Sequence, residues 1–205
     1  APGQFALVTF QAVKLPREEH PWTISSSPVQ GPGLQFTIKE SGDFTRRIRE
    51  LEIGDLARIR GPYGLFSHLA LEIDQGTELI MIAGGVGVTP FLSMLRYMAD
   101  EGDARKIILI WSNKTEEDIL WKEDLEKLAG ELSGLQVHHV LTRQHDWGGF
   151  TGYIDANVLQ QLLKETAGES PILLCGPAPM IAFVKEELQK CGFNPERFHT
   201  EEFRL

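Results

Sequence analysis

The chain has 205 residues, which is enough for one large domain or two small ones. Its 20 Lys and Arg against 29 Asp and Glu give a net charge of −9, which disfavours nucleic acid and anionic lipid as partners. Hydrophobic residues make up 42% of the chain and only 2 residues are cysteines, so we expect a packed core but no disulfide framework, Cys₄ zinc site or cysteine-ligated iron–sulfur cluster.

Short runs of β character dominate the first part of the chain. Turns rich in Gly, Pro and Ser, at residues 25–28 and 31–33, separate these runs. A short helical stretch starts near Thr45 and ends at Gly54. This pattern predicts a small antiparallel barrel. Its strands are expected over residues 5–10, 34–39 and 56–60.

From Glu78 onward, apolar strands alternate with helices, which is typical of a parallel, doubly wound sheet. The change of pattern falls at the polar sequence Asp74-Gln75-Gly76, so we expect two domains, residues 1–74 and 75–205. The predicted strands are 79–83, 106–111, 136–141 and 172–175, and the predicted helices are 90–100, 116–128, 156–165 and 179–191.

A glycine-rich turn follows the first strand of this second part and opens a helix. Glycines let the backbone approach a pyrophosphate closely, and a helix N-terminus offers free N–H groups to it. The turn therefore predicts a phosphate cradle, although a tight strand-to-helix turn would need the same glycines. The residues concerned are Gly84, Gly85, Val86, Gly87, Val88, Thr89, which adds a hydroxyl, and Pro90, which replaces the usual third glycine.

The next strand ends in Ser112, Asn113 and Lys114. An Asp or Glu at this place holds the ribose 2′-hydroxyl of NAD, whereas hydroxyl, amide and ammonium groups suit a 2′-phosphate. The sequence thus favours NADPH, with NADH possible, unless Lys114 is an ordinary surface lysine. Arg143 is a further candidate for nucleotide binding.

The strand at 172–175 ends in Cys175, Gly176 and Pro177, with Met180 one turn later. A small thiol, a glycine and a proline at the end of a strand make a narrow floor for a flat ring. Cys175 is equally typical of an ordinary buried cysteine, and no neighbouring His marks it as a covalent nucleophile.

The early part of the chain contains His20, Pro21, Trp22, Thr23, Ile24 and Ser25 in succession. An aromatic held after a proline and followed by hydroxyls suits a planar heteroaromatic ligand, although a core tryptophan beside a serine turn would look the same. With these motifs in this order, the chain resembles the ferredoxin–NADP reductase superfamily from Pro2 to Phe203. That resemblance implies an antiparallel FAD-binding barrel followed by an NADP-binding α/β domain.

The resemblance also implies roles for individual residues. Trp22 is expected against the flavin ring, Thr23 near its N5, and His20 on the pyrophosphate where many relatives carry arginine. Thr23, Cys175 and Phe203 are expected nearest the reacting rings, with Phe203 covering the flavin. Residues expected to flank FAD or its phosphates are Thr37, Ile38, Lys39, Gly42, Phe44 and Thr45, and the turn at 61–64 is expected between the domains.

The His-Pro-aromatic-Thr variant resembles ferric reductases and NADPH oxidases. It implies single-electron transfer to the haem of a membrane domain outside this chain, with this part on the cytoplasmic side, and barrel strands ahead of Ala1. No apolar run of the sequence reaches the roughly 20 residues of a bilayer span. Two alternatives stay open: a soluble reductase serving ferredoxin or flavodoxin, with an Arg46-Arg47-x-Arg49 docking cluster, and an FAD-binding subunit or sensor that oxidises no NAD(P)H.

Overall fold

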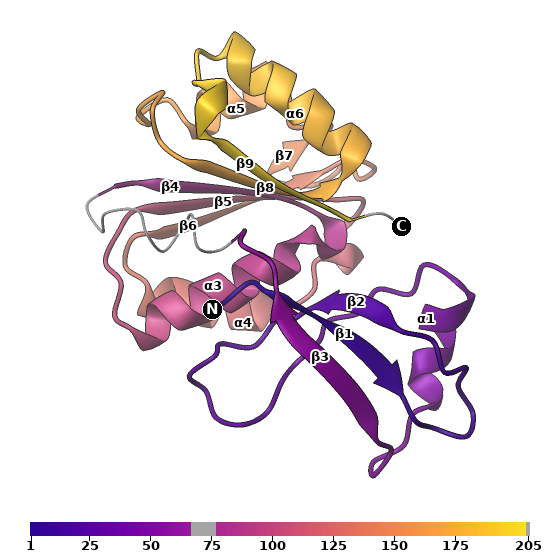
Figure 1. Ribbon diagram of the computed structural model, residues 1–205. Coiled ribbons are helices and arrows are strands. Elements are labelled where there is room, and N and C mark those ends of the chain that lie inside the picture. The colour runs from indigo at the N-terminus through magenta and orange to yellow at the C-terminus, as the bar shows by residue number, and fades with distance from the viewer. Residues whose placement is uncertain (67–76, 204–205) are drawn as a thin grey trace.

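A three-stranded antiparallel sheet and a six-stranded parallel sheet form the two halves of the computed structural model (Figure 1). The structure describes residues 1–66 and 77–203, without the side chain of Phe203. The expected domain junction at Asp74-Gln75-Gly76 lies outside the described residues, so the boundary between the domains stays a prediction.

The antiparallel sheet has the strand order β2-β1-β3 and supplies the barrel-like part that the sequence predicts. The predicted strand at 34–39 is reduced to a single bridge between Ile24 and Phe36. The reason is local, because the Gln35 N–H donates to the Ser26 hydroxyl instead of continuing a ladder. The elements are β1 (Phe5–Phe10), β2 (His20–Thr23), the short α1 (Asp43–Arg47), the 3-10 turn η1 (Ile48–Glu50) and β3 (Ala57–Tyr63).

The parallel sheet has the order β7-β6-β5-β4-β8-β9. Its three central strands, β5, β4 and β8, are mainly buried apolar runs because helices cover both faces. The strands are β4 (Leu79–Gly84), β5 (Ile107–Asn113), β6 (Leu135–Leu141), β7 (Phe150–Thr151), β8 (Ile172–Pro177) and β9 (Phe198–Phe203). The helices are α3 (Thr89–Asp100), α4 (Lys122–Glu131), α5 (Ala156–Leu162) and α6 (Ala178–Lys190), with 3-10 turns η2 (Gly85–Val88), η3 (Glu116–Asp118) and η4 (Pro195–Arg197).

Successive residues of β4 face opposite sides of this sheet, as the period of two requires. Leu79 and Met81 pack in the core under α3 and α4, whereas Ile80 and Ile82 pack in the core under α5 and α6. Figure 1 shows these two helix pairs on opposite faces of the sheet. The predicted doubly wound fold is therefore confirmed.

Two features of this half depart from the sequence prediction. The helix expected over 116–128 is divided into η3 and α4, because Trp121 between them takes a left-handed backbone conformation, with φ 61°. Strands β7 and β9 were not predicted, and β9 extends the sheet beyond β8 at one edge.

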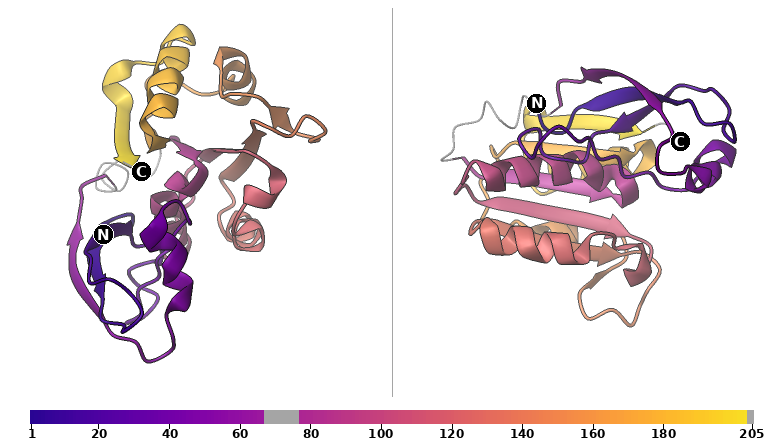
Figure 2. Two further views of the ribbon diagram at one scale, coloured as in Figure 1. Left: turned by 90° about the vertical axis from the view of Figure 1, so that its right-hand side faces the viewer. Right: turned by 90° about the horizontal axis from the view of Figure 1, so that it is seen from below.

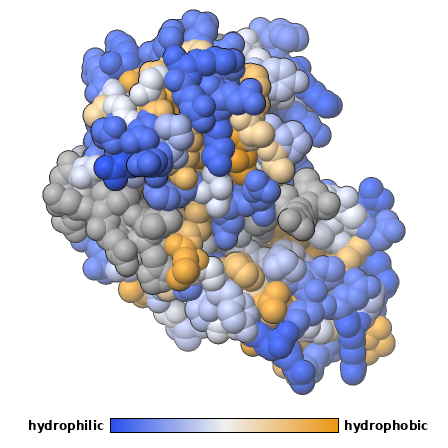
Figure 3. All heavy atoms as spheres, turned by 45° about the horizontal axis from the view of Figure 1, so that its top comes forward, coloured by the Kyte–Doolittle hydropathy of each residue, from blue (hydrophilic) through white to orange (hydrophobic). Residues whose placement is uncertain are grey.

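The strand order of this sheet reverses direction at β4, which pairs with β5 on one side and with β8 on the other. In open parallel sheets the crevice at such a switch point binds ligands. Helix α3 starts at this point and lies against the antiparallel half, as the further views in Figure 2 show. None of the described helices is long and apolar enough to cross a membrane. The face seen in Figure 3 is mostly hydrophilic, with hydrophobic residues in small separate areas.

Candidate functional site

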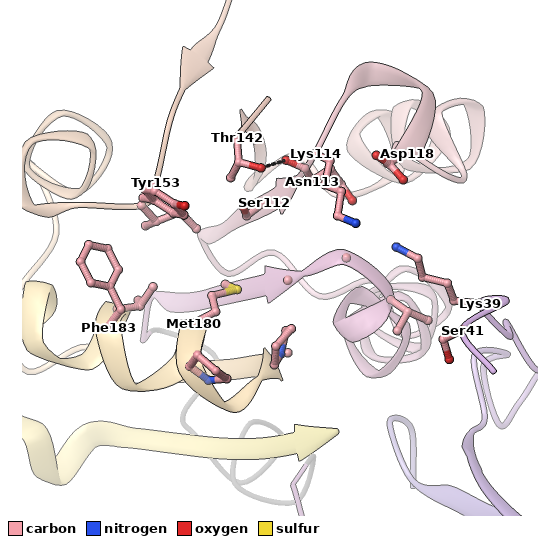
Figure 4. Close-up of a pocket in the computed structure, with 18 of the residues that line it drawn as sticks. Lys39, Ser41, Ser112, Asn113, Lys114, Asp118, Thr142, Tyr153, Met180 and Phe183 are labelled. Carbon is pink, nitrogen blue, oxygen red and sulfur yellow. Dashed lines mark hydrogen bonds between the residues drawn. The ribbon is translucent and has the colours of Figure 1, made fainter. Parts of the chain in front are cut away.

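A cavity of about 710 Å³ opens where β4, β5 and β8 end. Both halves line it, because Lys39, Glu40 and Ser41 of the antiparallel half face the ends of the parallel strands (Figure 4). The residues from the parallel half are Gly84, Gly85, Val86, Ser112, Asn113, Lys114, Asp118, Thr142, Tyr153, Ile154, Gly176, Pro177, Pro179, Met180, Phe183 and Val184. The size and the place suit a nucleotide.

The glycine-rich turn is packed directly on β8. A Cβ at Gly87 would lie 2.3 Å from the carbonyl oxygen of Cys175, and a Cβ at Gly84 would lie 2.3 Å from the sulfur of Met180. Gly85 has φ +53°, in the left-handed region that glycine tolerates. The indole N–H of Trp111 donates to the Gly85 carbonyl at 2.8 Å and fixes the turn from β5. Close packing and ligand access therefore both require glycine here.

The predicted cradle is divided between the cavity and the core. Gly84, Gly85 and Val86 line the cavity, whereas Gly87, Val88 and Pro90 are buried at the start of α3. The hydroxyl of Thr89 is also buried and donates to the Val86 carbonyl at 3.0 Å. The expectation that Thr89 adds a hydroxyl for a phosphate is thus corrected, because this hydroxyl closes the turn.

The residues expected to choose between nucleotides do meet in the cavity. Asn113 is 6% exposed, and its Nδ2 has no hydrogen-bond partner among the described residues. A buried amide N–H without a partner can donate a hydrogen bond to an oxygen of a bound ligand. The Thr142 hydroxyl donates to the Asn113 carbonyl at 3.3 Å (Figure 4). Figure 4 also shows the amines of Lys39 and Lys114 pointing toward each other from the two halves.

Arg143 lies outside this cavity. It lines a second, more polar depression of about 540 Å³ together with Gln144 and His145. Its backbone N–H donates to the Lys114 carbonyl at 2.9 Å. Arg143 thus follows Thr142, the residue after β6 that lines the first cavity. Its role in nucleotide binding stays a prediction.

At the end of β8, Gly176, Pro177 and Met180 line the cavity as expected, but Cys175 is fully buried. Burial raises the pKa of the Cys175 thiol well above its usual 9.0. The thiol is therefore neutral, and its sulfur lies behind the floor of the cavity. This arrangement agrees with an ordinary buried cysteine and gives no nucleophile.

Glu201 was missed by the sequence analysis. It lies opposite Cys175 in the pairing of β9 with β8. Burial raises the pKa of its carboxyl group to about 7, and its Oε2 has no partner in the described part of the chain. The signal in the sequence is a glutamate two residues before the expected aromatic, but only the strand pairing shows that it is buried.

Two exposed aromatics, Tyr153 and Phe183, were missed as well. Their ring centroids lie 6.1 Å apart at an interplanar angle of 64°, at the opposite end of the cavity from Lys39 (Figure 4). They stay 72% and 38% exposed, an unfavourable state for large apolar rings that a flat base packed against them would relieve.

Trp22 lies at the centre of a half-buried aromatic group on the antiparallel half. Its ring stacks on His20 at 5.6 Å between centroids and 15° between planes, and Phe44 lies 4.0 Å from His20. Phe10 and Phe36 complete the group, at 5.5 and 6.5 Å from Trp22. Such partly exposed ring faces fit a planar cofactor of the kind expected against Trp22, whereas the roles expected for His20 and Phe44 beside the phosphates of FAD stay predictions.

The residues after Trp22 are held by one another. Thr23 is buried, and the Ile24 N–H donates to the Gln4 carbonyl at 2.9 Å. The Thr37 hydroxyl donates to the Ser25 hydroxyl at 3.1 Å, which in turn donates to the Gln35 carbonyl at 3.2 Å. Pro21 is exposed and Ile38 is half-buried beside this network. The segment is therefore rigid, as a flavin edge requires.

The expected phosphate site at α1 has a different arrangement. The Thr45 hydroxyl accepts from the Gly42 N–H at 3.0 Å and from the Ser41 N–H at 2.9 Å, and it donates to the Gly42 carbonyl. It therefore caps its own five-residue helix. The Phe203 backbone ends β9 opposite Pro177, but the side chain lies outside the described residues, so its place over the flavin stays a prediction.

The donor set fits the two expected cofactors. The unpartnered Asn113 amide, the facing lysines and the exposed aromatic pair suit a dinucleotide along the cavity. The half-buried rings around Trp22 suit a flavin bound on the antiparallel half.

Comparisons with known proteins agree with this arrangement. Residues 81–186 match a family model described as an oxidoreductase NAD-binding domain, and residues 1–67 match one described as an FAD-binding domain. The γ subunit of sulfhydrogenase 2 from Pyrococcus furiosus is 32% identical over 97% of this chain and 70% of its own length.

NADH-cytochrome b5 reductase 1 of Pyricularia oryzae is 36% identical over 84% of this chain and 58% of its own length. The chain thus spans little more than half of that relative. Among solved structures, the cytochrome b5 reductase domain of Ulva prolifera nitrate reductase aligns with 98% of this chain and 85% of its own, at 25% identity and a TM-score of 0.81. The chain therefore belongs to the ferredoxin–NADP reductase superfamily of NAD(P)H-dependent FAD oxidoreductases.

Proposed function

We propose that this chain takes electrons from NAD(P)H and delivers them, through FAD, to a haem-containing acceptor outside the chain. The observation that carries the proposal is the cavity at the switch point of the parallel sheet, which Lys39 of the FAD-binding half also lines. When bound, FAD accepts two electrons as a hydride from the nicotinamide and releases them one at a time.

The work of the protein is to orient two planar rings. Transfer requires the reacting atoms to approach to about 3–3.5 Å, and holding them there removes much of the entropic barrier. Gly84, Gly85 and Val86 offer backbone to the pyrophosphate, and Tyr153 with Phe183 packs on the base at one end of the cavity. No acid–base pair is needed, because no proton leaves the nicotinamide.

On the flavin side, the ring of Trp22 offers a stacking face, and the network around Ser25 holds the adjoining backbone. Cys175 and Pro177 close the floor behind the nicotinamide position and exclude water from it. The covering role of Phe203 belongs to the same proposal.

For the electron donor we propose NADPH, with NADH accepted. β5 and β6 both lead into neutral or basic side chains, Asn113 and Lys114 in one case and Thr142 and Arg143 in the other. The cavity carboxylate nearest to them, Asp118, is engaged by the Thr115 N–H at 3.1 Å. The cytochrome b5 reductase relatives are named for NADH instead, so the titration compares the two nucleotides.

For the acceptor we propose haem, as in the sequence-based expectation of a ferric reductase or NADPH oxidase type of enzyme attached to a membrane domain on its cytoplasmic side. The relatives named for cytochrome b5 support a haem acceptor in general. A ferredoxin-type acceptor is the second candidate, since a glycine betaine monooxygenase reductase subunit of Pseudomonas aeruginosa is 29% identical over 98% of this chain.

The test is anaerobic titration of the FAD-loaded chain. We expect NADPH, and more weakly NADH, to bleach the flavin absorbance in a 1:1 ratio with bound FAD, and cytochrome b5 to restore it faster than ferredoxin does. A yellow protein that neither nucleotide bleaches would overturn the enzyme proposal, and faster recovery with ferredoxin would replace haem as acceptor.

A further inference from the structure

Helix α3 holds the segment at residues 25–27 through side chains on one of its faces. The Ser93 hydroxyl donates to the Ser26 carbonyl at 2.7 Å, and two turns further along the helix Asp100 Oδ2 accepts from the Ser27 hydroxyl at 2.6 Å. Residues three, four and seven apart share a helix face, so a single helix reaches along the whole segment. The helix that starts at the glycine-rich turn thus also anchors the chain beside Trp22.

Arg96 is the middle residue of this contact and makes the most connections. Its Nη1 donates to the Ser25 carbonyl at 2.6 Å and to Gln35 Oε1 at 3.3 Å, and its Nη2 donates to Asp124 Oδ2 at 2.6 Å. The residue is only 8% exposed. Its guanidinium carbon also lies 5.5 Å from the centroid of the Trp121 ring. The Arg96 side chain therefore joins three parts of the fold: residues 25–27, which we call the flavin-edge segment, helix α3, and the start of α4.

Trp121 makes this contact from a left-handed backbone conformation. Its φ of 61° and ψ of 30° place it in the left-handed region, and no other non-glycine among the described residues has a positive φ. A bulky residue in this region costs free energy, so the surrounding contacts must hold it there. The contact that it makes from this position is with the guanidinium of Arg96.

We propose that Arg96 is a positioning residue that fixes the nicotinamide site against the flavin site. The inference rests on the proposed function. The glycine-rich turn lies at the start of the helix that carries Arg96. Lys114 lies on the connection between β5 and α4, which ends at Trp121, and Asp124 lies in the first turn of α4. Arg96 connects both of these proposed nucleotide-binding segments to the backbone carbonyl of Ser25, two residues after Thr23.

Arginine is required for this role because its planar fork reaches partners in different directions while its face stacks on an indole. A lysine would keep the charge near Asp124 but could not hold Ser25 and Asp124 at once. Arg96→Lys therefore separates the positioning role from the simple neutralisation of the partly exposed Asp124 carboxylate.

The test compares Arg96→Lys with a matched control, Arg105→Lys, in the FAD-loaded chain. Arg105 is a buried arginine of the same half that lies just before β5, outside α3, and pairs with Asp103 at 2.8 Å. Stopped flow gives the limiting rate of flavin reduction and the dissociation constant of NADPH separately. Hydrogen exchange of residues 24–37 reports the anchoring of the segment without any turnover.

We expect Arg96→Lys to lower the limiting rate of flavin reduction by about tenfold to a hundredfold, with less than a threefold change in the NADPH dissociation constant. Exchange in residues 24–37 should become at least about tenfold faster, while the control changes neither quantity. Unchanged exchange would overturn the inference, as would a change in the dissociation constant alone. If NADPH and NADH fail to reduce even the unaltered chain, the proposed function fails, and the exchange result alone decides on the anchoring by Arg96.

Discussion

Glu201 and Cys175 stand side by side at the end of the parallel sheet, as register partners on β9 and β8, and one oxygen of the Glu201 carboxyl group is buried with no hydrogen-bond partner among residues 1–66 and 77–203. A charge in this position raises the pKa of the neighbouring thiol further, in addition to the larger effect of burial. The cavity floor is therefore most stable when both groups are neutral.

This arrangement predicts a pH dependence of stability. The pKa of Glu201 is raised from its usual 4.5 to about 7, so the folded state holds this proton more strongly than the unfolded state does. The stabilisation is complete below pH 4.5 and is lost as the pH rises to about 7. Glu201→Gln should reduce this pH-dependent decrease in the free energy of unfolding by about 2 kcal/mol, after allowance for partial solvent screening. Urea unfolding at pH 5 and pH 8 checks the sign, and a difference between these pH values that is the same in both proteins would contradict it.

Gly87→Ala should destabilise the chain strongly. The new methyl group would lie 2.3 Å from the Cys175 carbonyl oxygen, a backbone atom that cannot rotate away, so the turn and β8 must separate. We expect a loss of roughly 2–4 kcal/mol in the free energy of unfolding, together with weaker nucleotide binding. The control is Gly130→Ala in α4, which meets no atom within 4 Å and should stabilise by about 0.5–1 kcal/mol. Equal melting temperatures for the two variants would show that the close packing is absent.

Asn113→Leu should separate binding from stability. The amide nitrogen is buried with no partner in the described part of the chain, so its replacement by an apolar group of similar volume costs the free protein little, less than about 1 kcal/mol. The same change removes a hydrogen-bond donor to the nucleotide and should raise its dissociation constant by about tenfold. Fluorescence titration with NADPH and urea unfolding measure the two effects, and a large loss of stability with unchanged affinity would assign Asn113 to the core instead.

Lys114→Glu should change the preference between nucleotides. A carboxylate at the end of β5 repels a 2′-phosphate and can accept from a ribose hydroxyl, so the ratio of kcat/KM for NADPH over NADH should fall by about tenfold or more. Lys127→Glu, a change at an exposed lysine on α4, is the control for net charge and should leave the ratio unchanged. An unaltered ratio in Lys114→Glu would make Lys114 an ordinary surface lysine.

Local patterns predicted much of the fold and part of the site. Continuous apolar strands, glycines before a helix and a proline at its first turn depend on steric rules within a few residues, so Gly84, Gly85 and the doubly wound sheet were foreseeable. Ser112 to Lys114 were foreseeable too, because the ends of parallel strands gather at one edge of a sheet.

Other features of the site depend on partners that are remote in the sequence. Thr89 was expected to face a phosphate, but the closure of its own turn uses its hydroxyl. Tyr153 and Phe183 come together only because β7 and α6 converge at one end of the cavity. Arg143, next to a residue that lines the cavity, lines a different depression.

By itself, the sequence determined the class of each half and the place of the glycine-rich turn, because hydrophobic periodicity and backbone sterics act over short distances. Only the tertiary structure decided which polar groups are left without partners. Asn113 and Glu201 become an unpaired donor and an unpaired carboxyl group when sheet, helix and neighbouring half remove water from around them. The free energy of a polar group depends on what surrounds it in space, and that is set by packing between residues far apart along the chain.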